Sequence, residues 1–134
     1  MAGIRGKDTK PELAFRRSLH ALCFRYRLHL KGMPGKPDIV LPKYKAVIFV
    51  HGCFWHQHPG CRYASMPTTR PDFWMVKFAV NVNRDIETKA ALLRSGWRVG
   101  IVWECGLRNA AGVTEVRAEV AAWLAGGTPE LEVG

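Results

Sequence analysis

The chain has 134 residues, 48% of them hydrophobic, and its 20 Lys and Arg against 11 Asp and Glu give a net charge of +9. This length and apolar content predict one folded domain and exclude a wholly disordered chain. The charge favours a polyanionic partner, nucleic acid first and an anionic membrane surface second, with a generic basic protein as the alternative. No apolar run approaches the roughly 20 residues that cross a bilayer, and no signal peptide is visible, so we expect a cytoplasmic protein without a membrane partner.

Hydrophobic periodicity predicts the elements in chain order. Residues 1–8 are basic and glycine-containing, which is typical of an arm. The pattern then predicts a helix opened by a capping box at 9–12, strands over 24–30, 37–41 and 45–50, a long helix from 69–72 to Gly96, a strand over 97–103 and a helix over 114–125. We expect residues 126–134 to be a frayed tail. The order predicts a single α/β domain over residues 1–134, with a central mixed sheet flanked by helices.

Two expectations concern which side chains enter the core. The long helix is expected to bury one apolar face and to expose a polar one. The predicted buried face carries Phe73, Val76, Val80, Ile86, Ala90 and Leu93, and the predicted solvated face carries Lys77, Asn81, Asn83, Arg84 and Lys89. We also expect Cys23, near the end of the first helix, to be a core residue.

The segment after the third predicted strand is rich in metal-binding residues. Cys53, His58 and Cys61 follow a C-x4-H-x2-C spacing, and Cys105 at the end of a distant strand completes four candidate ligands. Zn²⁺ in closed structural sites takes four tetrahedral nitrogen and sulfur ligands, and three cysteines with one histidine are a common set. The sequence therefore predicts a zinc site, against the alternative of free thiols and a surface histidine.

A second group of residues suits phosphodiester chemistry. Asp38 begins a short strand, and pairing of that strand with the next is expected to bring it near His51. A carboxylate can hold Mg²⁺, and His51 and His56 can exchange protons near neutral pH. Both histidines could instead be further zinc ligands or their supports, and Glu12 could simply cap its helix. The adjacent aromatic pair at 54–55 could stack on bases, or lie in the core.

Three stretches closely resemble the very short patch repair (Vsr) mismatch endonucleases, and the likeness extends from Ile4 to about Arg108. The stretches are Pro34-Gly35-Lys36-Pro37-Asp38-Ile39-Val40, Val47-Ile48-Phe49-Val50-His51-Gly52-Cys53-Phe54-Trp55-His56-Gln57-His58, and Trp97-Arg98-Val99 to Trp103-Glu104-Cys105. The resemblance implies a restriction-endonuclease-like fold of the PD-(D/E)xK superfamily, with a variant active site. It further implies a Mg²⁺-dependent enzyme with a structural zinc. Such an enzyme nicks double-stranded DNA 5′ of the thymine in a T:G mispair left by deamination of 5-methylcytosine, initiating very short patch repair.

The resemblance also implies roles for individual residues. Asp38 and the backbone carbonyl of Val50 resemble the magnesium ligands, and relatives often have Thr at position 50. His51 and His56 resemble the active-site histidines, with His56 preferred as the group that activates water, and Glu12 matches a glutamate that reaches the metal's water shell. The implied zinc ligands are Cys53, His58, Cys61 and Cys105, and the implied DNA-binding residues are Phe54, Trp55, Lys77, Asn81, Met1 and Ile4.

The family further implies a monomer with functional links to mismatch-repair proteins and a cytosine methyltransferase, working on the bacterial nucleoid. Relatives usually carry a further basic stretch before the position of Met1, so we expect a chain that starts here, whether truncated or naturally short, to bind DNA more weakly. Two alternatives stay open. One is a zinc-stabilised DNA-binding module without catalysis, and the other is a nuclease of the same domain with a homing or restriction task.

Overall fold

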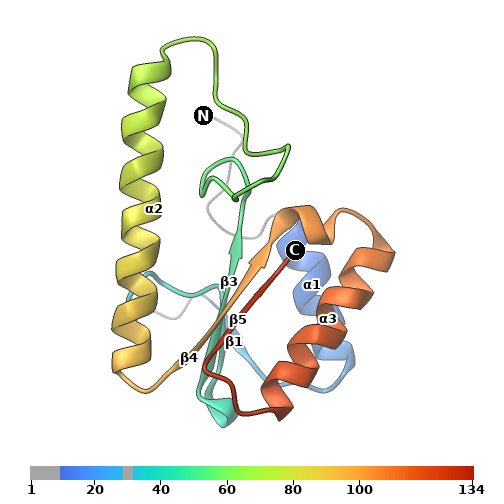
Figure 1. The fold of residues 1–134 in the computed structure, drawn as a ribbon. Coiled ribbons are helices and arrows are strands. Elements are labelled where there is room, and N and C mark those ends of the chain that lie inside the picture. Colours follow the sequence, from blue (N-terminus) through green and yellow to red (C-terminus); the bar gives the residue numbers. More distant parts are fainter. Residues whose placement is uncertain (1–9, 29–31) are drawn as a thin grey trace.

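The computed structural model describes residues 10–28 and 32–134, which fold around one five-stranded mixed sheet (Figure 1). The strand order is β1-β2-β3-β4-β5, antiparallel between the first three strands and parallel between the last three. The elements are α1 (Lys10–Ala21), β1 (Arg27–Leu28), β2 (Ile39–Leu41), the 3-10 turn η1 (Pro42–Tyr44), β3 (Ala46–His51), α2 (Pro71–Arg94), β4 (Arg98–Trp103), the 3-10 turn η2 (Glu104–Leu107), α3 (Ala110–Ala125) and β5 (Glu130–Val133).

Helices cover both faces of the sheet. Helices α1 and α3 pack on one face, and α2 lies on the other (Figure 1). The strands supply both cores through their alternation, because successive side chains point to opposite faces. Ile48 joins the core under α1 and α3, whereas Val47 and Phe49 join the core under α2. The continuous apolar run of β3 follows from its central position, where both faces are buried.

Helix α2 connects the parallel strands β3 and β4, so the carboxyl ends of these two strands meet at the same edge of the sheet. The loop 52–70 leaves β3 at this edge, and the upper half of α2 rises beside it, beyond the end of the sheet (Figure 1). This edge therefore gathers the segments that carry the predicted functional residues. Within the described residues, no helix is both long and apolar enough to span a membrane.

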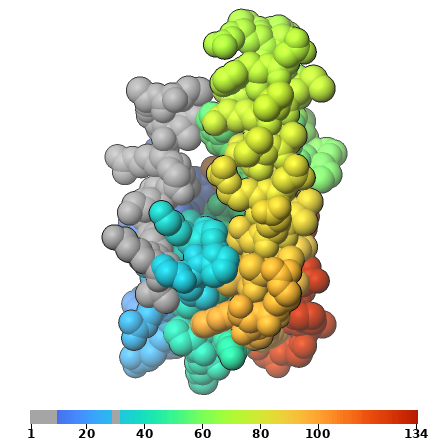
Figure 2. Space-filling model, turned by 90° about the vertical axis from the view of Figure 1, so that its left-hand side faces the viewer, coloured from blue at the N-terminus to red at the C-terminus, as the bar shows by residue number. Residues whose placement is uncertain are grey.

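The predicted buried face of α2 is wrong for four of its six residues, whereas Leu93 packs against the core under α2 as predicted. Phe73, Val76, Val80 and Ile86 are 47–66% exposed, whereas the buried residues of α2 are Phe78 and Leu92. Figure 2 shows this helix along the length of the molecule with its outer side uncovered. The first half of α2 is apolar on nearly every side, so its periodicity gives no unique direction, and burial is decided by where the sheet and the loop lie.

Three smaller expectations also need correction. Cys23 is exposed, because it lies after the end of α1 in a left-handed conformation with φ of 67°. The strand expected over 24–30 comprises only Arg27–Leu28 within the described residues. The expected frayed tail instead contains β5, whose backbone pairs with β4 and whose Glu130 carboxylate lies 2.9 Å from Nζ of Lys89.

Candidate active site and metal centre

A cavity of about 240 Å³ opens between α2 and the ends of β2 and β3. It combines two carboxylates, two imidazoles, basic side chains and apolar side chains. Its lining residues are Gly35, Lys36, Asp38, Phe49, Val50, His51, His56, Asn81, Arg84, Asp85, Thr88, Lys89, Val99 and Ile101. The cavity thus brings together Asp38, Val50, His51, His56 and Asn81 from the sequence-based predictions, with Arg84 and Lys89 as cations that suit a phosphate.

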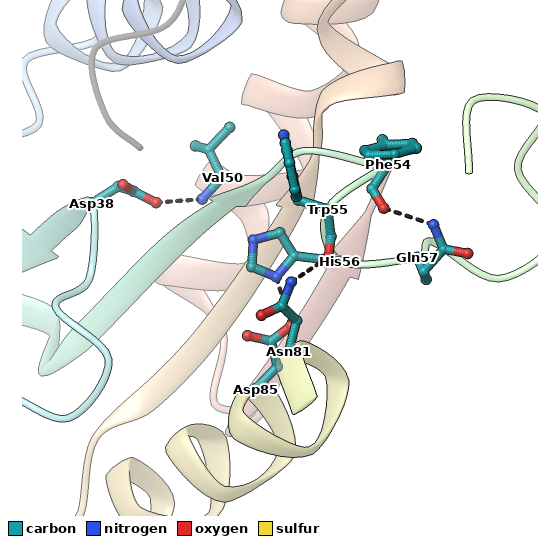
Figure 3. A network of polar contacts seen from close by, with 8 residues as sticks. All are labelled: Asp38, Val50, Phe54, Trp55, His56, Gln57, Asn81 and Asp85. Atoms are coloured by element: carbon teal, nitrogen blue, oxygen red, sulfur yellow. Dashed lines mark hydrogen bonds and ion pairs between the residues drawn. The ribbon is translucent and has the colours of Figure 1, made fainter. Parts of the chain in front are cut away.

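Asp38 immediately precedes β2 and is buried, with 8% of its surface exposed. The antiparallel pairing of Ile39 with Ile48 carries it to the far end of β3, as the hairpin pattern predicts. There its Oδ2 accepts a hydrogen bond of 2.8 Å from the backbone N–H of Val50 (Figure 3). This bond fixes the carboxylate beside Val50, the residue whose backbone carbonyl was predicted as a metal ligand.

The two histidines lie against each other in the cavity. The rings of His51 and His56 are stacked, with centroids 3.9 Å apart and planes 3° apart. Nδ1 of His56 lies 2.6 Å from Oδ2 of Asp85 on α2, so its N–H donates to this carboxylate. Figure 3 shows the ring of His56 with its second nitrogen turned toward the side of Asp38 and Val50. A carboxylate that holds Nδ1–H leaves Nε2 as the nitrogen that can accept a proton.

His51 differs from His56 in its surroundings. It is 6% exposed, and burial, followed by repulsion from His56, lowers the pKa of His51 to about 3, while Asp85 opposes the shift. Its Nδ1 is buried and has no hydrogen-bond partner within the described residues. His51 is therefore neutral near pH 7, because protonation would place an unsolvated charge between aromatic rings.

The four predicted zinc ligands converge, although Cys105 is separated from the others by the whole of α2 and β4. Their ligand atoms all lie within 4.8 Å of one another. Nδ1 of His58 is 3.7 Å from Sγ of Cys53 and 3.5 Å from Sγ of Cys105. A tetrahedral Zn²⁺ with bonds of about 2.3 Å to sulfur and about 2.0 Å to nitrogen separates such atoms by about 3.5 Å, so this donor set fits the ion.

The thiol environments agree with a metal centre. Burial raises the pKa of Cys53 to about 12, and burial also raises the pKa of Cys105. The backbone hydrogen bond at Tyr63 is the main cause that lowers the pKa of Cys61. Two of the three thiols thus need a cation beside them to ionise at neutral pH, and a coordinated metal supplies that charge.

The aromatic pair after Cys53 belongs to a larger cluster. Phe54 and Trp55 are half-buried and lie edge to face at 5.1 Å, and both contact Trp74 of α2, at 5.6 and 5.8 Å. Phe54 also meets the buried Phe78 at 5.1 Å. Nδ2 of Asn81 donates to the backbone oxygen of Trp55 at 3.1 Å (Figure 3). These contacts hold a rigid aromatic surface beside the cavity.

Other predicted residues lie elsewhere. Glu12 is 2% exposed on α1 and accepts a hydrogen bond of 3.1 Å from Arg16, but it is not among the residues that line the described cavity. Lys77 is exposed on α2. Met1 and Ile4, together with the rest of the predicted arm, lie outside the described residues.

The sequence analysis missed two residues of this site, Asp85 and Trp74. Asp85 is one helical turn after Asn81, and Trp74 is one turn before Phe78, so each shares a helix face with a neighbour that packs inward. That spacing could have identified them if the inward face of α2 had been assigned correctly.

Comparisons with known proteins agree with this geometry. A family model described as DNA mismatch endonuclease Vsr matches residues 1–63. The chain is 49% identical over 117 residues to the type II nicking enzyme V.XorIIP of Xanthomonas oryzae pv. oryzae, covering 87% of this chain and 85% of that protein. It is 38% identical over 128 residues to the DNA mismatch endonuclease Vsr of Escherichia coli K12, covering 94% of this chain and 81% of that protein. With similarity over nearly its whole length, the chain belongs to the Vsr DNA mismatch endonuclease family and is a DNA endonuclease.

Proposed function

We propose that this endonuclease nicks double-stranded DNA on the 5′ side of the thymine in a T:G mispair, in a Mg²⁺-dependent reaction that initiates very short patch repair. The observation that carries the proposal is the convergence of buried Asp38 and the His56–Asp85 pair on one cavity. A DNA-binding module needs no such carboxylate and hydrogen-bonded imidazole. The mismatch task is supported by the relative from Escherichia coli, which is described as a DNA mismatch endonuclease.

The carboxylate of Asp38 and the backbone carbonyl of Val50 would hold the Mg²⁺. Both offer oxygen atoms, the ligand type that this cation prefers. When bound, Mg²⁺ stabilises the charge that develops on the phosphate and lowers the pKa of a bound water. The hydrogen bond from the N–H of Val50 holds the Asp38 carboxylate in place before any metal binds. Glu12 would act through the water shell of the metal.

His56 would be the general base. Its Nδ1–H is held by Asp85, so Nε2 can accept a proton from the attacking water. His51 would act as a neutral group, since burial lowers its pKa to about 3. Its stacked contact with His56 would orient the base and offer a neutral N–H to the phosphate. Water would lose a proton to Nε2 of His56 as its oxygen forms a bond to phosphorus. The bond from phosphorus to the 3′ oxygen would break, and the leaving 3′ oxygen would take a proton from solvent, giving a 5′-phosphate and a 3′-hydroxyl.

DNA recognition would use the aromatic cluster and the helix beside it. Phe54 and Trp55 would insert beside the mispair, at a cost of a few kcal/mol for the unstacked step. Asn81 and Lys77 would contact the mismatched bases or their phosphates, and Met1 and Ile4 would enter the minor groove. Asn81 also donates a hydrogen bond to the backbone oxygen of Trp55, so it links the aromatic pair to helix α2.

The zinc site, the fold variant and the partners of the enzyme also belong to the proposed function. The zinc would be structural, and its four ligands would fix the loop 52–70 to the end of β4. The fold would be a restriction-endonuclease-like variant, and the enzyme would act as a monomer. Functional links to mismatch-repair proteins and to a cytosine methyltransferase would follow from its substrate.

The test is a nicking assay on a duplex with one T:G mispair and on its T:A match, with the cut position mapped. We expect a Mg²⁺-dependent nick 5′ of the mispaired thymine and no cut in the match. Asp38→Asn should abolish nicking and preserve binding measured by fluorescence anisotropy, whereas Glu119→Gln, an exposed carboxyl variant on α3, should behave as wild type. Equal cleavage of both duplexes, or full activity of Asp38→Asn, would refute the proposal.

The second candidate function is nicking directed by the flanking DNA sequence. Several relatives are described as type II nicking enzymes, among them V.NmeAIP of Neisseria meningitidis, 47% identical over 111 residues. A panel of all mispairs in varied flanking sequences separates this task from the first. Cleavage that follows the flanking sequence and ignores the mispair would favour it.

A further inference from the structure

Trp103 lies at the junction of the two candidate centres. It ends β4, pairs in register with His51 of β3, and is 6% exposed. The face of its indole stacks on the imidazole of His58, with centroids 4.2 Å and planes 8° apart. The same indole meets the ring of His51 edge to face, at 5.2 Å and 73°. One side chain thus contacts a residue of the zinc site and a residue of the active-site cavity.

The indole has a third contact, with the C-terminal strand β5. Its Nε1–H donates to Oε2 of Glu132 at 3.1 Å. Glu132 lies on β5, where it pairs in register with Ile101 of β4. Trp103 and Glu132 also line, with His51 and His56, a second cavity of about 210 Å³ behind the two histidines. This hydrogen bond therefore joins the side chain of a residue of the C-terminal strand to the indole that contacts both candidate centres.

The ring of His58 needs a contact that fixes its orientation, and the indole of Trp103 provides one. A metal-ligating histidine usually donates its other ring N–H to a carboxylate, a carbonyl or water, which fixes the ring. His58 offers Nδ1 to the cysteine cluster, and no protein group within the described residues hydrogen-bonds its Nε2. The stacked indole restrains the ring instead, and the indole is itself restrained by Glu132, because rotation about its side-chain torsions would break that hydrogen bond.

We propose that Trp103 is a positioning residue that holds the rings of His58 and His51 in a fixed mutual arrangement, and that Glu132 of β5 sets the orientation of its indole. The part that concerns His51 rests on the proposed function, whereas the part that concerns His58 depends only on zinc binding. Loosening the indole should therefore weaken zinc retention and slow the chemical step together, without weakening DNA binding.

The test compares substitutions at both ends of the hydrogen bond in the zinc-loaded full chain. Glu132→Ala removes the acceptor, Glu132→Gln keeps an oxygen acceptor, and Trp103→Phe keeps a ring over His58 but removes the donor. Glu119→Ala is the control, because Glu119 is an exposed glutamate on α3 that lines neither cavity. The readouts are the rate of zinc transfer to a chromophoric chelator, the single-turnover nicking rate at saturating DNA, and the Kd for DNA.

We expect Glu132→Ala to accelerate zinc loss and to slow nicking, each by roughly 3- to 10-fold, the net contribution of a typical intramolecular hydrogen bond. Glu132→Gln and Glu119→Ala should stay within about 2-fold of wild type, the range of surface substitutions. In the Trp103→Phe background, Glu132→Ala should have no further effect, since the donor is already absent. The Kd for DNA should stay constant throughout.

Four outcomes would overturn the inference. They are a zinc-loss rate unchanged by Glu132→Ala, an equal effect of Glu119→Ala, an undiminished effect of Glu132→Ala in the Trp103→Phe background, and a wild type that retains no zinc. Altered zinc loss with unaltered nicking would overturn the His51 part alone. If Trp103→Phe fails to fold, the comparison of the three glutamate variants decides the question. A wild type that holds zinc but does not nick would refute the proposed function, and zinc retention would still test the contact with His58.

Discussion

Acidification should destabilise this protein through His51. The pKa of His51 is about 3 in the folded chain, against 6.5 in an unfolded one, so the native state binds fewer protons at every pH between these values. The stability that depends on a neutral His51 is present above pH 6.5 and is lost as the pH falls toward 3. A difference of about 3.5 pH units corresponds to about 5 kcal/mol at full protonation, and to about 2 kcal/mol at pH 5.

The assay is urea denaturation at several pH values from 8 to 5, followed by fluorescence of the five tryptophans. The informative quantity is the difference in unfolding free energy between wild type and His51→Gln, because protonation of other groups is common to both. We expect this difference to shrink by about 2 kcal/mol between pH 8 and pH 5, since glutamine cannot bind the proton. His20→Gln, an exposed variant on α1, is the control.

A constant difference between wild type and His51→Gln across this range would refute the reasoning, because it would mean that the native state tolerates the charge. If the difference in unfolding free energy between wild type and His20→Gln changed equally with pH, the acid sensitivity would arise in the unfolded state. The unfolding m-value should stay constant throughout, so that the change reports stability and not a change in the surface exposed.

Further predictions concern the core, the turn before Asp38 and the metal loop. Leu92→Ala should cost about 2–5 kcal/mol of stability, because Leu92 is fully buried, whereas Ile86→Ala should stay within about 0.5 kcal/mol in the same denaturation experiment. Gly35→Ala should lower the melting temperature, because Gly35 has φ of +71° and an added Cβ would lie 2.3 Å from Cγ2 of Thr88. Adding Thr88→Ser should restore only part of the loss, because the backbone strain at position 35 remains. An unchanged melting temperature for Gly35→Ala would contradict the turn geometry. Cys105→Ser should reduce bound zinc measured by elemental analysis and increase proteolysis of the loop 52–70, and an unchanged metal content would exclude Cys105 as a ligand.

The reliable part of the sequence-based prediction was local. The hairpin of two short apolar strands placed Asp38 beside the end of β3, because antiparallel pairing fixes which residues face each other. The spacing of Cys53, His58 and Cys61 also predicted a cluster, since ligands this close in sequence can surround one ion. Cys105 could join this cluster only if the ends of β3 and β4 lie side by side. The structure shows that these two strands pair in parallel.

The sequence by itself predicted the first four strands of the sheet, the cluster of candidate metal ligands and the candidate catalytic residues Asp38, His51 and His56. Only the tertiary structure decided which side of α2 faces inward, because the first half of this helix is apolar on nearly every side. That choice brings Asp85 to His56 and Trp74 to the aromatic pair. The contacts of Trp103 also depend on β5, which the sequence pattern did not predict. Periodicity describes one element at a time, whereas these contacts arise where three elements end at one edge of the sheet.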